Sequence, residues 1–246
     1  LYPYEVRLKT TGNGVSKVYV SLWGDGSIAV VNPSQSKKLK HIVVDRHPTV
    51  MIFNKQQTRL FVVNSNADTV SVIDTANDKV IEKGNVRLAE GQLIGGSPEG
   101  LALSEDEQTL YVANAHANAV AVVSLAKNRS KQEKSNLLGF IPTGNYASAV
   151  AVVGKQLFIA NGKGTGMENS SMTVNDSGLY PNMPNDKFPA ERYNKRGMYS
   201  GVIVAGNISL VAVPDEPKLF TYTQSVMRNN GLLGREKKNI FGGGEH

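Results

Sequence analysis

The sequence repeats one pattern four times, and this repeat limits the folds that the chain can adopt. Each copy begins with an aromatic residue in a short hydrophobic run, and a polar loop follows. In the first three copies the loop leads directly into a run of alternating polar and apolar residues. The copies begin at Tyr19, Phe61, Tyr111 and Phe158, at intervals of 42, 50 and 47 residues. Strand-like units recurring every 40 to 50 residues are typical of the blades of a β-propeller.

Two further segments complete each unit. The first opens at a recurrent proline position, and a polar turn leads from it into the aromatic run. This position holds Pro3, Pro48, Pro98 and Ala147. A last hydrophobic run, such as KLKHIVV or LLGFIPT, leads to the next unit. Four short strands joined by turns predict an all-β fold of the propeller type.

The fourth unit departs from the pattern. A rim insertion over 162–201, rich in Gly, Asn, Pro and Met, separates its aromatic run from the alternating strand at 207–215, and no closing strand follows. Loops of this length are usually functional or disordered. Since propellers have four to eight blades, we expect a partial ring whose other blades lie upstream, with a complete four-bladed ring as the alternative.

A helix is predicted after the last strand. Asp215 is suited to the N-cap, Pro217 to the first turn and Gly231 to the exit. The expected apolar stripe consists of Leu219, Phe220, Val226 and Met227. We therefore divide the chain into propeller blades over 1–214 and a C-terminal helix with a flexible tail over 215–246.

Composition excludes several classes of protein. The chain has no cysteine, so it has neither disulfides nor thiolate chemistry. The formal net charge is +6 at pH 7, but the basic residues lie in short loop clusters without interleaved aromatic residues. A surface that binds nucleic acid needs basic residues and aromatic residues interleaved on one element. We therefore expect no nucleic-acid partner. No apolar run reaches the roughly 18 residues of a membrane span.

The strand order also predicts where candidate site residues meet. Because neighbouring strands alternate in direction, the loop after the second strand and the turn before the first open on the same rim of the ring. Repeat proteins commonly bind ligands where such loops collect. The candidate ligand-binding residues on this rim are Trp23, Asp25, His47, Asn64, Asp68, Glu99, Asn114, His116, Tyr146, Asn161 and Lys163.

Plainer explanations compete with a site at most of these positions. Recurrent asparagine is expected from turn chemistry alone, since Asn tolerates left-handed backbone. Two rim histidines, His47 and His116, are too few for a metal site. We therefore assign no metal, no cofactor and no catalytic set. Glu99 is the one carboxylate placed suitably for acid–base chemistry near the central channel.

Two strings carry a family resemblance. YVANAHANAVAVV and FVVNSNADTVSVIDTANDKVIE resemble the YVTN-family β-propeller repeat, over residues 1 to about 160. The resemblance implies YVTN-type, WD40-like blades that are part of a seven-bladed ring, in an exported bacterial or archaeal protein of the periplasm or cell surface.

A second resemblance involves the last blades. GFIPTGNYASAVAV, FIANGKGTG, NISLVAVPD and QSVMRNNG look like the end of the propeller in bacterial proteins that continue into an alkaline-phosphatase-like phosphoesterase domain. It implies a non-catalytic binding or scaffolding module, with that domain or another protein bound through the rim and the 162–201 insertion. A lactonase-like hydrolase acting at the rim or channel is one alternative, because YVTN and lactonase-type propellers are similar. A surface-layer adhesion array is the other.

Overall fold

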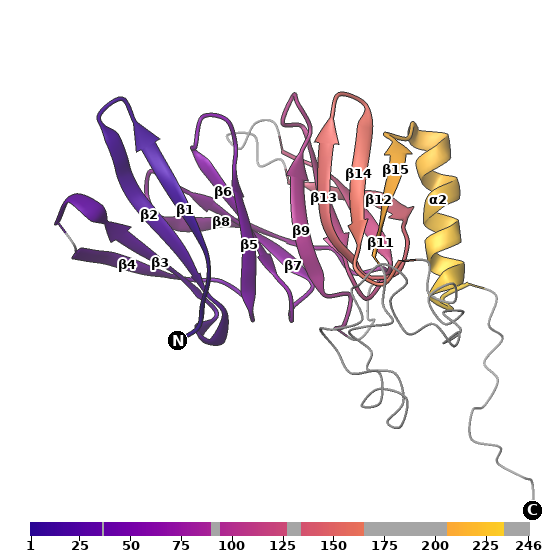
Figure 1. Cartoon of the computed structure of the whole chain (residues 1–246), viewed down its shortest axis with the longest axis horizontal. Coiled ribbons are helices and arrows are strands. Elements are labelled where there is room, and N and C mark those ends of the chain that lie inside the picture. The colour runs from indigo at the N-terminus through magenta and orange to yellow at the C-terminus, as the bar shows by residue number, and fades with distance from the viewer. Residues whose placement is uncertain (36, 90–93, 127–133, 165–205, 234–246) are drawn as a thin grey trace, which may run out of the picture.

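The computed structural model describes residues 1–35, 37–89, 94–126, 134–164 and 206–233. In this part the chain forms four antiparallel sheets in a row, and each sheet is one unit of the repeat (Figure 1). The all-β propeller prediction is confirmed. We number these sheets as blades 1 to 4.

The strands follow the predicted units. In blade 1 they are β1 (Pro3–Thr11), β2 (Gly14–Leu22), β3 (Ser27–Asn32) and β4 (Lys37–Val43). In blade 2 they are β5 (Pro48–Phe53), β6 (Arg59–Asn64), β7 (Thr69–Asp74) and β8 (Lys79–Asn85). In blade 3 they are β9 (Pro98–Leu103), β10 (Thr109–Asn114), β11 (Ala119–Ser124) and β12 (Asn136–Pro142). In blade 4 they are β13 (Ala147–Val153), β14 (Gln156–Asn161) and β15 (Asn207–Ala212).

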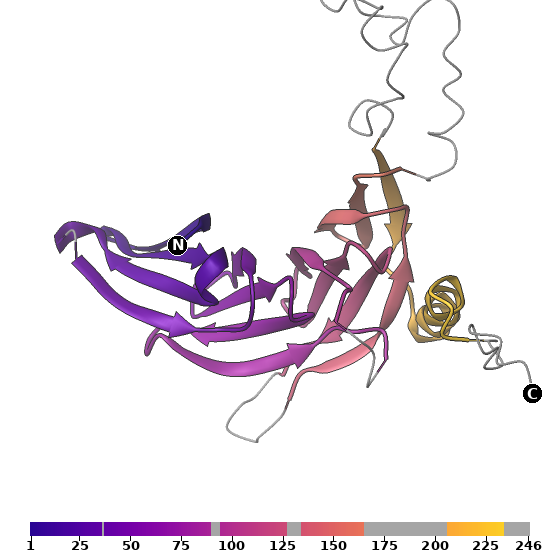
Figure 2. The ribbon, with the colours of Figure 1, turned by 90° about the horizontal axis from the view of Figure 1, so that it is seen from below.

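The first strands of the blades lie side by side along the inner face. β1 contacts β5, β5 contacts β9, and β9 contacts β13. Figure 2 shows the row of blades curving, with these first strands on the concave side. The first strands therefore lie nearest the axis of the arc. The 162–201 insertion lies outside the described residues from 165 onwards.

The hydrophobic core lies between the blades. Three buried clusters join blade 1 to blade 2, blade 2 to blade 3 and blade 3 to blade 4. The repeat aromatics Tyr19, Phe61 and Tyr111 are at most 2% exposed, because each packs against the following blade. Burial of such a ring is the main stabilising contribution of the repeat.

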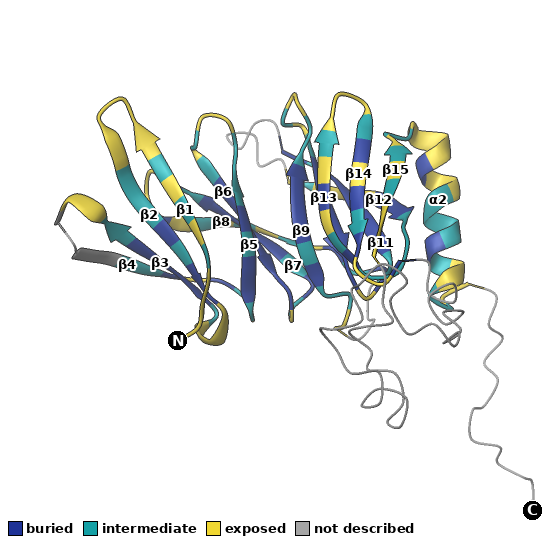
Figure 3. Ribbon diagram, viewed as in Figure 1, coloured by how far each residue is buried: buried dark blue, intermediate teal, exposed yellow. Residues whose placement is uncertain are grey.

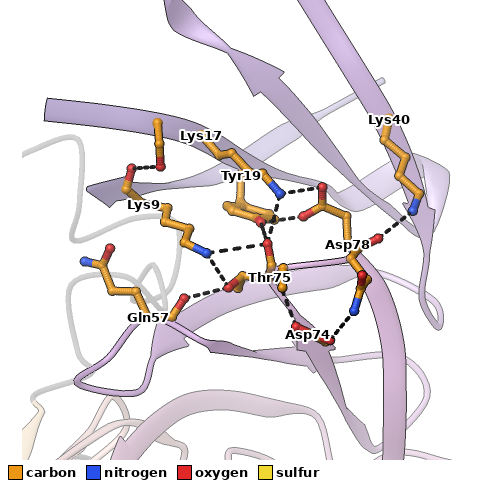
Figure 4. Close-up of polar contacts among 11 residues, drawn as sticks. Lys9, Lys17, Tyr19, Lys40, Gln57, Asp74, Thr75 and Asp78 are labelled. Carbon is orange, nitrogen blue, oxygen red and sulfur yellow. Dashed lines mark hydrogen bonds and ion pairs between the residues drawn. The ribbon is translucent and has the colours of Figure 1, made fainter. Parts of the chain in front are cut away.

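A polar cluster joins the turn after β7 to strands of blade 1 (Figure 4). The Tyr19 hydroxyl donates to Asp78 at 2.6 Å, and Lys17 Nζ pairs with the same carboxylate at 2.7 Å. Lys9 Nζ donates to Thr75 Oγ1 at 2.7 Å. Burial and the bond to Asp78 raise the pKa of Tyr19, so its hydroxyl stays a donor. The cluster fixes the turn after β7 against blade 1.

The C-terminal helix α2 (Glu216–Asn229) packs on β12. The Asp215 carboxylate accepts from the Lys218 amide, as an N-cap does. Leu219 and Val226 are buried, but Phe220 is 66% exposed, so its place in the apolar stripe was wrong. Phe220 follows Leu219 by one residue, about 100° around the helix, and points away from β12. No helix in the described ranges is long and apolar enough to cross a membrane.

Candidate functional site

The loops predicted to share one rim do meet there. The backbone amide of Ser65 donates to His47 O, that of Ala115 to Ser97 O, and that of Gly162 to Tyr146 O. Each bond joins the loop after a second strand to the turn before a first strand. Three of these residues, His47, Ser97 and Tyr146, have positive φ angles of 54°, 48° and 63°. Non-glycine residues in this region cost energy and cluster at functional positions.

The asparagines at the end of each second strand are buried. Asn64, Asn114 and Asn161 are at most 1% exposed. Their Nδ2 atoms donate to neighbouring strands and loops, for example from Asn114 to Val86 O at 2.8 Å. Their Oδ1 atoms are buried without a partner among the described residues. These side chains hold the loops in place and do not reach the surface of the rim.

One group of rim residues lies over blades 1 and 2. The Trp23 and His47 rings stack with centroids 3.8 Å apart and planes at 13°. Asp25 accepts a hydrogen bond from Ser27 Oγ at 2.6 Å and lies 3.6 Å from His41 Nδ1. This group is partly exposed and offers an aromatic surface beside a carboxylate.

Asp68 has a different role. It is 1% exposed, and its carboxylate accepts hydrogen bonds from the amides of Gly95, Gly96 and Ser97 at 2.8 to 3.1 Å. Arg87 Nε also lies 3.8 Å from this carboxylate. Asp68 therefore positions the turn that leads into β9, the strand that carries Glu99.

A second group gathers over blades 3 and 4. His116 and Tyr146 make an edge-to-face contact with centroids 5.5 Å apart, and Lys163 Nζ lies 4.8 Å from the Tyr146 ring centroid. These three side chains line a hollow of about 290 Å³ together with Ala115, Asn118 and Asn145. Asn118 holds the group together, since its Oδ1 accepts from the Tyr146 amide at 2.8 Å.

Glu99 interacts electrostatically with His116 of this second group. It is half-buried on the inner strand β9, and Ser97 Oγ donates to its Oε1 at 2.9 Å. Burial raises the pKa of Glu99, although the Ser97 bond and the charge of His116 oppose the increase. Burial and the nearby charge of Glu99 in turn raise the pKa of Tyr4 on β1. A half-buried carboxyl group with a raised pKa is a candidate for proton transfer.

Three residues of blade 1 were missed by sequence reasoning. Tyr4, Glu5 and Arg7 lie on the inner strand β1. Burial raises the pKa of Glu5, whose carboxylate contacts Arg7 at 2.6 Å and accepts from the Met51 amide. The alternation of polar and apolar residues in PYEVRLK was the available signal for Glu5 and Arg7, which lie two residues apart and share one face of β1. It gives no signal for Tyr4, which is adjacent to Glu5. Among the described residues, no group of three or more His, Asp or Glu could hold a metal ion.

Comparison with known proteins identifies the family. The model of the family described as "Lactonase, 7-bladed beta-propeller" matches residues 14–151, more than half of the chain. The chain belongs to this lactonase family. No curated protein matches it.

Solved structures of similar fold agree with the propeller. A putative 6-phosphogluconolactonase from Bacteroides fragilis has a TM-score of 0.54 at 19% identity, covering 65% of this chain and 48% of that one. The periplasmic gluconolactonase of Pseudomonas aeruginosa has a TM-score of 0.54 at 16% identity, covering 65% and 47%. At these identities the likeness shows the fold alone. This chain spans less than half the length of either structure.

The family match corrects one expectation from the sequence. We expected a non-catalytic scaffolding module associated with a phosphoesterase-like domain, and this expectation was wrong, because the matching family is one of lactonases. The scaffold prediction depended on the resemblance of the last blades, whereas the hydrolase alternative depended on the likeness of the whole repeat to lactonase-type propellers. The family supports the hydrolase alternative instead, in preference to the adhesion array.

Proposed function

We propose that this chain forms part of a lactone-hydrolysing enzyme and that Glu99 transfers protons in the reaction. The observation that carries the proposal is the half-buried Glu99 carboxyl on the inner strand β9, with its raised pKa and within electrostatic reach of His116. Membership of the lactonase family supports lactone hydrolysis as the reaction in which this carboxyl acts. The hollow lined by His116, Tyr146 and Lys163 would receive the lactone ring.

The chemistry needs one proton acceptor and one site of positive charge. Ionised Glu99 takes a proton from water as the water oxygen bonds to the lactone carbonyl carbon. The charge that develops on the carbonyl oxygen is stabilised by the Lys163 ammonium. When the ring C–O bond breaks, Glu99 returns the proton to the leaving oxygen. The product is the open hydroxy acid, and Glu99 ends the cycle ionised.

Two finer features of the proposal come from likeness. We propose YVTN-type blades, on the repeat strings at Phe61 and Tyr111, and an exported location, periplasmic or at the cell surface. The Pseudomonas aeruginosa neighbour is itself described as periplasmic. Binding of another protein through the rim, the absence of a nucleic-acid partner, and a role for Trp23, Asp25 and His47 in ligand contact stay predictions.

The test is hydrolysis of a δ-lactone, such as glucono-δ-lactone, by the purified chain with the spontaneous rate subtracted. Glu99→Gln keeps the shape of the side chain but cannot accept a proton, so the enzymatic rate should fall about 100-fold. The matched control is Glu105→Gln, which changes a carboxylate of blade 3 on the opposite face and keeps an acceptor for the Gly154 amide. Its rate should stay within about twofold.

The pH dependence provides a second measurement. A base must be ionised to act, so the rate should fall as the pH drops through the raised pKa of Glu99. The acid limb should therefore lie above the ordinary value of 4.5 for a glutamate. Hydrolysis by the wild-type chain no faster than by Glu99→Gln, across several lactones, would contradict the proposal.

A further inference from the structure

A second hollow on the rim lies over blades 1 and 2, apart from the hollow proposed to receive the lactone. It has a volume of about 480 Å³, and the two hollows share no lining residue. Small-molecule sites usually have volumes between roughly 300 and 1,000 Å³. The lining comes mainly from the turn between β2 and β3, the link between β4 and β5, and the loop after β6. The size of this hollow therefore suits a small ligand.

Trp23 forms a fixed aromatic platform in this hollow. It lies on the short helical turn η1 (Trp23–Asp25), which Figure 3 shows as an exposed segment between β2 and β3. The indole ring is stacked on the His47 ring, and at the end of the turn the Val44 amide donates to Gly26 O at 2.9 Å. Trp23 is nevertheless 37% exposed. The platform thus exists before any ligand binds, which lowers the entropic cost of binding.

Hydrogen-bonding groups of both kinds line the hollow beside this platform. The hydrogen bond and the ion-pair contact of Asp25 described above both involve Oδ2, which leaves Oδ1 as an acceptor for a ligand. The second carboxylate, Asp45, is already paired with Lys83 at 2.6 Å. Arg46 and Asn66 are exposed and supply N–H donors, and the Asn66 amide also has an acceptor oxygen. The hollow can therefore both donate to a ligand and accept from it.

Apolar side chains complete the lining. Val43 is 76% exposed and Ile94 is 49% exposed, and both line the hollow together with Trp23. A ligand that fits must therefore present an apolar face and a polar edge at the same time.

This combination of groups favours a neutral saccharide over other classes of ligand. A sugar ring has an apolar face of C–H groups, which can stack on an indole, and an edge of hydroxyl groups, which both donate and accept. An organic cation would be repelled by Arg46, and an anion would be repelled by Asp25. A flat apolar compound would cover Asp25 and Arg46 without giving them a hydrogen-bond partner, which costs free energy.

We propose that the hollow over blades 1 and 2 binds a neutral saccharide. The sugar ring stacks on Trp23, which the His47 ring supports from behind. The sugar hydroxyls donate to Asp25 and accept from Arg46 and Asn66. This assigns a class of ligand to the rim residues for which only ligand contact was predicted. The proposal is independent of the lactone chemistry, because the two hollows have separate linings.

The test uses the fluorescence of Trp23, which is the single tryptophan of the chain. Titration with glucose, maltose and N-acetylglucosamine should give a saturable change in emission with at least one sugar. Asp25→Ala should raise the dissociation constant about tenfold, as expected for the loss of a hydrogen bond to a charged group. Asn66→Ala removes a neutral partner and should raise it about threefold. Because Asn66 is exposed, this second variant keeps the test valid if circular dichroism shows that Asp25→Ala alters the fold.

The matched control is Asn145→Ala, which changes an asparagine of the other hollow and should leave the titration unchanged. Isothermal titration calorimetry on the same chains detects sugar bound anywhere on the protein. Heat of binding without a change in emission would place the sugar outside this hollow and overturn the proposal, as would the absence of binding by all three sugars. A response to tetramethylammonium but to no sugar would overturn the class of ligand. Glu99→Gln should bind sugar like the wild type whatever its rate on lactones, so the two proposals can fail separately.

Discussion

At the scale of single residues, one repeat position is adapted to different neighbours. Tyr19 and Tyr111 both place a buried ring between two blades, but only Tyr19 has a buried carboxylate within reach of its hydroxyl in the described part of the chain. Asp78 receives that hydroxyl and the Lys17 ammonium together. Hydrogen bonds to a charged partner stabilise a fold more than neutral ones do.

Tyr19→Phe should therefore lower the free energy of unfolding by about 1.5 to 3 kcal/mol, because Asp78 loses one of two partners while remaining buried. Urea unfolding of the variant and the wild type measures the difference. Tyr111→Phe is the matched control, since it removes the same atom from blade 3, and it should cost less than about 0.5 kcal/mol. Equal costs for the two variants would show that the bond to Asp78 contributes little.

The candidate site was only partly predictable at this scale. Glu99 could be singled out from its place after Pro98, and His116, Tyr146 and Lys163 from the strand order. The buried state of Asn64, Asn114 and Asn161 could not, because the same residue type serves exposed turns and buried loops equally well. Tyr4 was missed because its proximity to Glu99 depends on how blade 1 curves around to blade 3.

At the scale of elements, a glycine on β9 allows the inner strands β9 and β13 to approach closely. A side chain at Gly100 on β9 would place its Cβ 2.9 Å from the Cα of Ala149 on β13 and 3.2 Å from the Val150 amide nitrogen. Backbone atoms cannot move aside as a flexible side chain can. Gly100 therefore sets how closely blades 3 and 4 approach, next to Glu99.

Gly100→Ala should lower the free energy of unfolding by about 1 to 3 kcal/mol, because the two strands must separate. The control is Gly84→Ala on β8, where an added Cβ meets nothing within 4 Å, and its effect should be about 0.5 kcal/mol or less. Thermal unfolding of both variants is sufficient. A neutral Gly100→Ala would mean that the blades can move apart freely.

The starts of strands and of the helix were the features most easily predicted from the sequence. The proline positions give the starts of β1, β5 and β9, and Asp215 gives the start of α2, since these residues act through local backbone chemistry. The error at Phe220 arose because a stripe of apolar residues on a short helix does not show which edge of the stripe faces the sheet. Only the packing of α2 on β12 decides that.

At the scale of the whole molecule, position in the arc decides what a residue contributes. Phe61 and Phe158 are the same residue at the same repeat position, but Phe61 is 1% exposed and Phe158 is 38% exposed. The count of four blades could be predicted from the sequence. Which blade faces would be left uncovered depends on the whole assembly.

Phe61→Ala should cost about 3 to 5 kcal/mol of folding free energy, as expected for a buried ring. Phe158→Ala should cost about 1 kcal/mol or less, measured by urea unfolding, because its ring is already partly exposed. If Phe158→Ala cost as much as Phe61→Ala, the exposure of the ring would not decide its contribution to stability.

The left-handed residues before the first strands have a consequence for how this protein can change. His47, Ser97 and Tyr146 occupy one backbone slot, and in each case the carbonyl oxygen of that residue accepts a main-chain bond. The amides of Ser97 and Tyr146 are held in addition by the Asp68 and Asn118 side chains, so none of these bonds uses the side chain at the slot itself. Natural variation or an engineer can therefore exchange imidazole, hydroxyl and phenol at this slot while the loop keeps its course. We therefore expect substitutions at these three positions to change the side chains that the rim presents while the fold is kept.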